Sequence, residues 1–257
     1  MYYQWILFDA DGTLFDYDRA EAWALERTFE QFGLPLQPHA VERYRRINGE
    51  IWHQFEQGRI DQRRLRTQRF EALAQALGLS YDPASFSTHY LENLGLGVDL
   101  IDGAERVLRA LQDRVRLMLI TNGLKDVQRS RLARSTIGHY FSDVIISEEV
   151  GAAKPDRRIF DVAFERMGFP PRDSVLIVGD SLSSDIKGGS DYGIHTCWYN
   201  PGSVPQAGDL EIHYEIAELE ELLHLVGPLA EAPDQSAGSQ GYDSARMMGG
   251  GQDGPND

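Results

Sequence analysis

Five short apolar stretches, each long enough for one buried strand, limit what this chain can fold into. They are residues 4–10, 115–121, 143–147, 174–180 and 195–199. Each is apolar enough to be covered on both faces of a sheet. Helical patterns lie between the later stretches, such as residues 125–138 and 157–168, and each of these two ends on a glycine suited to a helix C-terminus. Alternating strands and helices predict an α/β fold with a Rossmann-like parallel sheet.

The segment between the first two expected strands is too long for one crossover connection. Residues 17–98 carry several amphipathic helical patterns and no convincing strand, so we expect an inserted helical domain there. Residues 1–16 and 99–228 would then form the core domain. From residue 229 onward the chain is rich in Gly, Ser, Asp and Gln and poor in branched apolar residues, which predicts a disordered C-terminal tail over residues 229–257.

Charge and cysteine content restrict the partners. The net charge of −15 leaves no surplus of Lys and Arg to hold a phosphate backbone, so a nucleic acid polymer is not expected as a partner. No stretch approaches the ~18 apolar residues of a membrane span, and a secretory leader is not recognisable. The single cysteine, Cys197, excludes an internal disulfide. We therefore expect a cytoplasmic protein, a monomer or weak homodimer, with no membrane association.

Polar and charged residues follow the expected strands where those strands end. In an open parallel sheet, ligands bind beyond the carboxyl ends of the strands. The residues expected there are Asp9, Asp11, Thr121, Asn122, Lys154, Asp180 and Asp185. Carboxylates gathered at one edge repel each other unless a cation lies among them, and an all-oxygen ligand set suits Mg²⁺. A carboxylate beside Mg²⁺ and an ammonium group can attack phosphorus.

Taken one at a time, these segments also fit a turn, a strand end, a helix start or a helix cap. Their order, each at an expected strand end, resembles the four motifs of the haloacid dehalogenase (HAD) superfamily. D-x-D-x-T is present as DADGT, the hydrophobic run to Thr as LMLIT, the Lys motif as GAAKP, and GD-x-x-x-x-D as GDSLSSD. The resemblance covers residues 1–228 and implies that the helical insertion is a cap over the site.

The resemblance implies a role for each of these residues. Asp9 would be the nucleophile that forms an aspartyl-phosphate, and Asp11 the acid that protonates the leaving oxygen and then activates water. Thr121 and the backbone N–H of Asn122 would bind the phosphoryl group, while Lys154 would neutralise charge. Mg²⁺ would be held by Asp9, Asp180 and the backbone carbonyl of Asp11, with Asp185 as an outer or alternative ligand. A small phosphate monoester is the implied substrate.

A narrower resemblance appears in the segments INGEIWHQFEQGRI, VIISEEVGAAKPDRRIFD and GIHTCWYN. They are similar to pyrimidine 5′-nucleotidases of the YjjG type, which usually carry Glu where this chain has Gly12. In the cap, Trp52 would stack a pyrimidine and Asn48 would read its edge, although Trp52 also fits the core face of a helix. The arginine-rich residues 59–70 are expected to be solvated.

Two other functions fit the same motifs. A sugar-phosphate phosphatase or phosphomutase would use the same chemistry under a different cap. A non-catalytic binding protein would retain the fold with a vestigial site. The intact set of motif residues favours an enzyme over a binding protein. The narrower resemblance implies that its substrates are nucleoside 5′-monophosphates, pyrimidine ones in particular.

Overall fold

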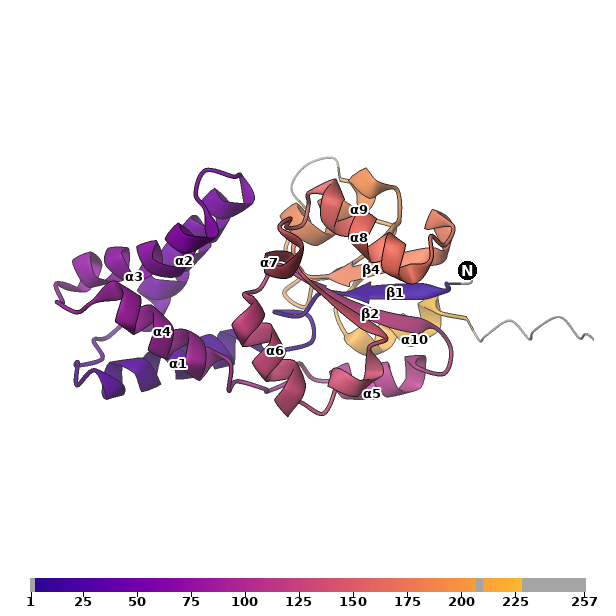
Figure 1. Ribbon diagram of the computed structural model, residues 1–257. Coiled ribbons are helices and arrows are strands. Elements are labelled where there is room, and N and C mark those ends of the chain that lie inside the picture. Colours follow the sequence, from indigo (N-terminus) through magenta and orange to yellow (C-terminus); the bar gives the residue numbers. More distant parts are fainter. Residues whose placement is uncertain (1–2, 207–209, 228–257) are drawn as a thin grey trace, which may run out of the picture.

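The computed structural model describes residues 3–206 and 210–227 (Figure 1). Within these ranges a single parallel sheet has the strand order β3-β2-β1-β4-β5-β6. Its strands are β1 (Trp5–Phe8), β2 (Arg116–Thr121), β3 (Asp143–Ile146), β4 (Val175–Gly179), β5 (His195–Tyr199) and β6 (Tyr214–Ile216). The expected parallel α/β fold is confirmed, and β6 is a strand that the sequence pattern did not indicate. The tail, residues 229–257, lies outside the described residues.

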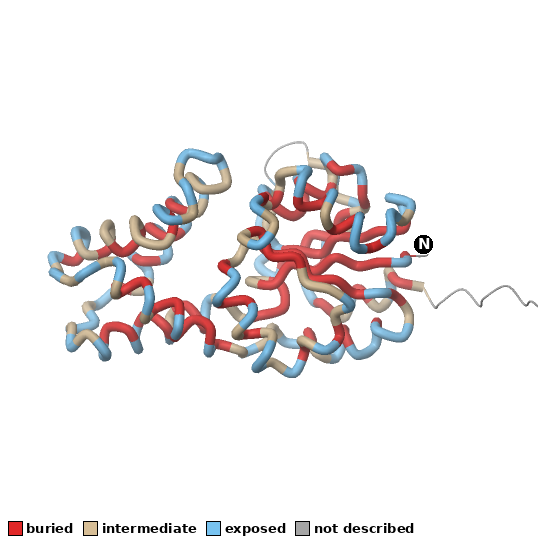
Figure 2. The backbone as a smooth tube through the Cα atoms, viewed as in Figure 1, coloured by how far each residue is buried: buried red, intermediate tan, exposed pale blue. Residues whose placement is uncertain are grey.

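Strand β1 runs through the middle of the sheet and is buried throughout, as the red strands of Figure 2 show. Alternate residues face opposite layers of helices because side chains alternate across a strand. Ile6 and Phe8 pack in one apolar cluster with α5 (Ala104–Leu111) and α10 (Leu222–Leu225). Trp5 and Leu7 pack in a second cluster with α8 (Arg157–Met167) and α9 (Lys187–Tyr192). The sheet is therefore covered on both faces.

Four helices form a separate unit after β1, drawn in purple in Figure 1. They are α1 (Tyr17–Gln31), α2 (Ala40–Glu56), α3 (Gln62–Leu77) and α4 (Pro83–Leu94). Three of them begin at an aspartate whose carboxylate accepts a hydrogen bond from a backbone N–H of the first turn: Asp16, Asp61 and Asp82. The aromatic rings of Tyr44 and Phe70 stack inside this unit, with Phe86 beside them. We call these four helices the cap, and its exact boundaries stay a prediction.

Two short segments connect the cap to the core, and they lie side by side. The backbone N–H of Asp16 donates to Asp99 O at 2.9 Å, and that of Ile101 donates to Leu14 O at 2.9 Å. Phe15 forms an antiparallel bridge with Leu100 between these bonds. The chain thus leaves the core and returns to it through one paired ribbon.

The remaining helices connect the later strands. They are α6 (Lys125–Arg134), α7 (Ser147–Val150) and several short turns, including a π-helical turn at Leu182–Ile186. Helix α8 ends at Gly168 in the left-handed conformation, as expected. The same prediction for Gly138 is wrong, because α6 already stops at Arg134 with Ser135 extended, and Gly138 begins a 3₁₀ turn. No helix in the described ranges is long and apolar enough to cross a membrane.

Candidate active site

A cleft of about 850 Å³ opens at the carboxyl ends of β1, β2 and β4. The chain passes from β1 to one side of the sheet, through β2 and β3, whereas β4 and β5 lie on the other side. The loops after β1 and β4 therefore separate, which is where open α/β sheets bind ligands. The cleft is lined by the core residues Asp9, Asp11, Gly12, Thr121, Asn122, Lys154 and Asp180, and by the cap residues Tyr17, Asn48, Trp52 and Glu56.

Lys154 lies at the floor of this cleft with its ammonium group almost fully buried. Its Nζ donates to Asp9 Oδ1 at 2.5 Å and to Ile120 O at 2.7 Å, and it lies 2.7 Å from Asp185 Oδ1. Asp185 is itself buried, and its Oδ2 accepts the backbone N–H of Ser181 at 3.1 Å. One ammonium thus partly compensates two buried carboxylates that come from different strand ends.

Asp180 follows β4 and is open to the cleft. Thr13 Oγ1 donates to its Oδ1 at 3.3 Å, and the indole N–H of Trp198 donates to its backbone carbonyl at 2.9 Å. Gly12 faces this carboxylate with φ +82°, and a Cβ placed there would lie 2.6 Å from Asp180 Oδ2. A larger residue at position 12 would be strained and would displace Asp180. A glutamate, which the narrower resemblance implies at position 12, therefore does not fit this arrangement.

The carboxylates of the cleft resist ionisation when no cation is bound. Burial raises the pKa of Asp9 well above its usual range, the Lys154 ammonium opposes this, and Asp185 and Asp180 add to it. Burial, followed by the Asp185 carboxylate, raises the pKa of Asp180 to about 7. Burial alone would lower the pKa of Lys154, but Asp185 and Asp9 raise it overall. With all three carboxylates ionised, the site would carry more negative charge than the Lys154 ammonium neutralises.

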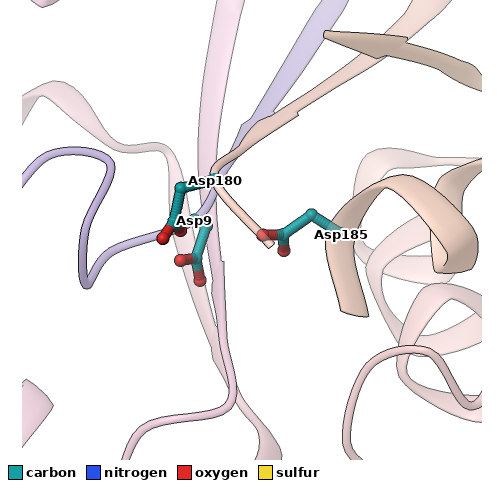
Figure 3. Close-up of side chains that lie close together, drawn as sticks. All are labelled: Asp9, Asp180 and Asp185. Atoms are coloured by element: carbon teal, nitrogen blue, oxygen red, sulfur yellow. The ribbon is translucent and has the colours of Figure 1, made fainter. Parts of the chain in front are cut away.

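Three carboxylates have the arrangement that a metal ion requires. Figure 3 shows Asp9, Asp180 and Asp185 turned toward one another. One oxygen from each lies within 4.8 Å of the others. Oxygen ligands of this kind, in a site with excess negative charge, suit a hard divalent cation such as Mg²⁺. Because both oxygens of Asp185 already lie against Lys154 and Ser181, Asp9 and Asp180 are the better placed direct ligands.

Thr121 is the last residue of β2 and Asn122 follows it, beside Asp9. The Oγ1 of Thr121 accepts the backbone N–H of Gly123 at 3.0 Å. The Asn122 side chain joins two loops, since its Nδ2 donates to Lys154 O at 2.8 Å and its Oδ1 accepts the Lys154 backbone N–H at 2.7 Å. Asn122 thereby places Lys154 opposite Asp9, a function of its amide that the sequence did not reveal.

Asp11 lies on the cap side of the cleft, outside the group of three carboxylates. Its Oδ2 accepts a hydrogen bond from Gln128 Nε2 at 2.6 Å, and its Oδ1 forms an ion pair with Arg131 Nη1. Both partners are on α6 and fully buried. The side chain of Asp11 is therefore separate from the candidate metal ligands, and any contact of Asp11 with a metal through its backbone carbonyl stays a prediction.

The two cap residues named from the sequence differ in whether other cap residues already occupy their polar groups with hydrogen bonds. Trp52 lines the cleft, half-buried, with its ring edge-to-face against Phe55 at 5.7 Å. The amide of Asn48 is already engaged: its Nδ2 donates to Tyr17 Oη at 3.2 Å and to Glu21 Oε1 at 3.1 Å, and its Oδ1 accepts from Arg69 Nη1 at 2.9 Å. Asn48 would have to exchange these partners to read a base.

The expectation that residues 59–70 are simply solvated is wrong for two arginines. Arg69 is buried in the cap over the rings of Phe70 and Tyr90. Arg66 bonds Glu148 of the core at 2.9 Å. The even spread of charge in this segment concealed both contacts, because they depend on partners far away in the sequence.

Known proteins resemble this chain over most of its length. Residues 3–193 match the family model described as a haloacid dehalogenase-like hydrolase. The HAD-hydrolase YfnB of Bacillus subtilis is 38% identical over 87% of this chain and 95% of its own. The pyrimidine 5′-nucleotidase YjjG of Escherichia coli is 34% identical over 88% of this chain and 99% of its own. A crystal structure of YfnB bound to magnesium, which reveals interdomain movement, covers 88% of this chain and 99% of its own with a TM-score of 0.84.

Proposed function

This chain belongs to the haloacid dehalogenase-like hydrolases, and we propose that it is a Mg²⁺-dependent phosphatase of nucleoside 5′-monophosphates, with pyrimidine nucleotides preferred. The observation that carries the proposal is the convergence of Asp9, Asp11, Thr121 and Lys154 around one cleft that the cap also lines. The similarity to YjjG and to the pyrimidine 5′-nucleotidase PynA of Streptococcus pneumoniae, 32% identical over 87% of this chain and 94% of its own, supports the choice of substrate.

In the first step, a carboxylate oxygen of Asp9 attacks phosphorus and the bond to the leaving oxygen breaks. Asp11 donates a proton to that oxygen, so that the nucleoside leaves as an alcohol and Asp9 carries the phosphoryl group. Lys154 holds Asp9 in place at 2.5 Å and offsets the negative charge that gathers on the phosphoryl oxygens. The hydroxyl of Thr121 and the backbone N–H of Asn122 face the same oxygens.

In the second step, Asp11 takes a proton from water, the water oxygen attacks phosphorus, and the bond to Asp9 breaks. Phosphate is released, Asp9 is again a carboxylate, and Asp11 again carries the proton that it donates in the first step. Asp9 and Asp180 would hold Mg²⁺, with Asp185 behind them. When bound, the cation supplies positive charge that draws the phosphate into a cleft otherwise rich in carboxylates.

The cap would select the leaving group. Trp52 lines the cleft while packing against the core of the cap, and a flat aromatic ring suits any base. Nucleotide-sized ligands fit clefts of a few hundred to about 1,000 Å³, which includes this one at about 850 Å³. A cytoplasmic location and a monomeric or weakly dimeric state stay predictions.

Phosphate release from a substrate panel with MgCl₂ tests the proposal. The panel holds the 5′-monophosphates of uridine, thymidine, cytidine, adenosine and guanosine, together with β-glucose 1-phosphate. We expect kcat/KM at least about tenfold higher for the pyrimidine nucleotides than for the sugar phosphate, a difference of about 1.4 kcal/mol in transition-state binding. Asp9→Asn protein is the control for contaminating phosphatases. Equal or better hydrolysis of β-glucose 1-phosphate, or its conversion to a 6-phosphate, would overturn the nucleotide assignment.

A further inference from the structure

The carboxylate of Asp11 is held by two buried side chains from a single helix. We propose that Gln128 and Arg131 are positioning residues that orient Asp11 for proton transfer, and that Arg131 does so while bound to the end of α4, the last helix of the cap. The inference rests on the proposed function only in assigning proton transfer to Asp11. It does not depend on which phosphate ester the cap selects.

The two contacts fix both oxygens of Asp11. Gln128 Nε2 donates to one oxygen at 2.6 Å, and Arg131 Nη1 pairs with the other. Gln128 and Arg131 are three residues apart on α6, so they project from the same side of the helix. Asp11 remains about one quarter exposed, toward the cleft. Because both of its oxygens are bonded to side chains of α6, the Asp11 carboxylate has little freedom to turn away from the cleft.

Gly123, which lies just after β2, leaves the space that the side-chain amide of Gln128 occupies. A Cβ on Gly123 would collide with the Gln128 amide that reaches Asp11. Gln128 and Arg131 are each fully buried, yet Gln128 Oε1 and Arg131 Nη2 have no hydrogen-bond partner among the described residues. Incomplete pairing of this kind weakens the fold.

Arg131 also contacts both ends of the cap. Its Nε donates to Leu94 O, the last residue of α4, at 3.2 Å. Its guanidinium lies over the rings of Phe15 and Tyr17, at 5.6 and 5.8 Å from their centroids. Phe15 belongs to the first connection, and Tyr17 begins α1, the first helix of the cap. One planar side chain therefore touches the first and last helices of the cap and the proton donor, which places the orientation of Asp11 under the control of the cap.

A buried ion pair is weak evidence for a stabilising role, because replacing such a pair with apolar side chains is often neutral. A role in positioning makes a different prediction, which concerns the leaving group. A 4-nitrophenolate group departs without a proton, whereas phenolate needs far more help. The ratio of kcat/KM for 4-nitrophenyl phosphate to that for phenyl phosphate therefore reports proton donation. Loss of folded protein cancels from the ratio, since both rates are measured on one preparation.

The experiment measures this ratio with MgCl₂ in the parent, Arg131→Met, Arg131→Lys, Gln128→Leu, Asp11→Asn and the double variant Asp11→Asn with Arg131→Met. For Arg131→Met we expect phenyl phosphate hydrolysis to fall about 10- to 100-fold, as misplaced catalytic groups do, with 4-nitrophenyl phosphate changed less than about threefold. Arg131→Lys should fail to rescue, because an ammonium cannot bond Leu94 O and Asp11 in the manner of the planar guanidinium. Gln128→Leu should shift the ratio in the same direction.

Asp11→Asn should give the largest ratio, and adding Arg131→Met to it should raise the ratio no further, since both substitutions remove the same function. Arg134→Met, at an exposed residue that ends the same helix, is the matched control and should leave the ratio unchanged. Equal losses on both aryl phosphates, or multiplying effects in the double variant, would overturn the proposal. If the nucleotide panel shows no nucleotide preference, the proposed function falls while the aryl ratio still decides this inference.

Discussion

Among the residues that the structure describes, Lys154 has the only ammonium beside the carboxylates of the site. Replacing Lys154 with methionine removes this ammonium but keeps a side chain of similar length. In the parent, Lys154 Nζ lies 2.5 Å from Asp9 Oδ1 and 2.7 Å from Asp185 Oδ1. The variant leaves both buried carboxylates without their counter-charge. It also leaves Ile120 O, which accepts from Nζ at 2.7 Å, without that donor.

The loss of stability in Lys154→Met follows from these contacts. Removing one partner of a buried ion pair lowers the free energy of unfolding by about 3–5 kcal/mol. For a chain with 150–250 ordered residues, each kcal/mol shifts Tm by about 2–4 °C. We therefore expect Tm of Lys154→Met to fall by roughly 6–20 °C in EDTA at pH 8. Since the variant site is more negative, added MgCl₂ should raise its Tm by more than it raises that of the parent.

Differential scanning fluorimetry of parent and variant, in EDTA and in MgCl₂, measures both effects. Lys187→Met is the matched control, because Lys187 is half-exposed and pairs only at the surface, with Asp191 at 2.6 Å. Such a pair contributes about 0–1 kcal/mol, so this control should stay close to the parent. A fall in Tm of less than about 2 °C for Lys154→Met, or an equal fall for Lys187→Met, would refute the reasoning that Lys154 stabilises the fold by offsetting the charges of Asp9 and Asp185.

Three further predictions concern the other site residues. Asp9→Asn should abolish release of phosphate while Tm stays close to that of the parent, because the buried Lys154 keeps the carboxylate of Asp185 as its counter-charge. Turnover within tenfold of the parent would contradict the covalent mechanism. In EDTA, the raised pKa of Asp180, about 7 against 3.8 unfolded, means that the folded state holds its proton more tightly, so the free energy of unfolding should fall as pH rises from about 4 to about 7. Solvent in the cleft weakens this effect, and a Tm series over that range should be flatter for Asp180→Asn. Trp52→Ala should raise KM for nucleotides by about 5- to 150-fold, the equivalent of about 1–3 kcal/mol of base stacking. It should leave KM for 4-nitrophenyl phosphate nearly unchanged. A large loss of Tm with equal effects on both substrates would instead identify Trp52 as a core residue.

The strands of the sheet were predictable because burial on both faces produces continuous apolar runs. Each of the five expected stretches contains a strand, and no strand end differs from the expected one by more than two residues. Strand β6 escaped notice because Tyr214–Ile216 is only three residues long and has one buried side chain. The end of α6 was misplaced because Gly138 suggested a helix C-terminus, whereas the chain turns extended at Ser135.

The candidate site was predictable as far as it depends on strand ends. Topology alone gathers Asp9, Thr121 and Asp180 once their strands lie in one sheet. The partners that orient these groups were not predictable, because Gln128 and Arg131 reach Asp11 across more than one hundred residues of sequence. No local pattern distinguishes such side chains from solvated residues on a helix.

The paired ribbon that joins cap and core makes the length of the cap independent of the core. Leu14 and Ile101 are already bonded to each other, as are Asp16 and Asp99, so the two ends of the inserted segment meet whether the insertion is long or short. The entropy of closing a loop grows only slowly with its length once its ends are fixed together. A lineage could therefore lengthen, shorten or exchange the cap, and so acquire a new substrate, while the sheet and its carboxylates remain in register. The ribbon therefore allows substrate specificity to change through the cap while the catalytic residues of the core keep their positions.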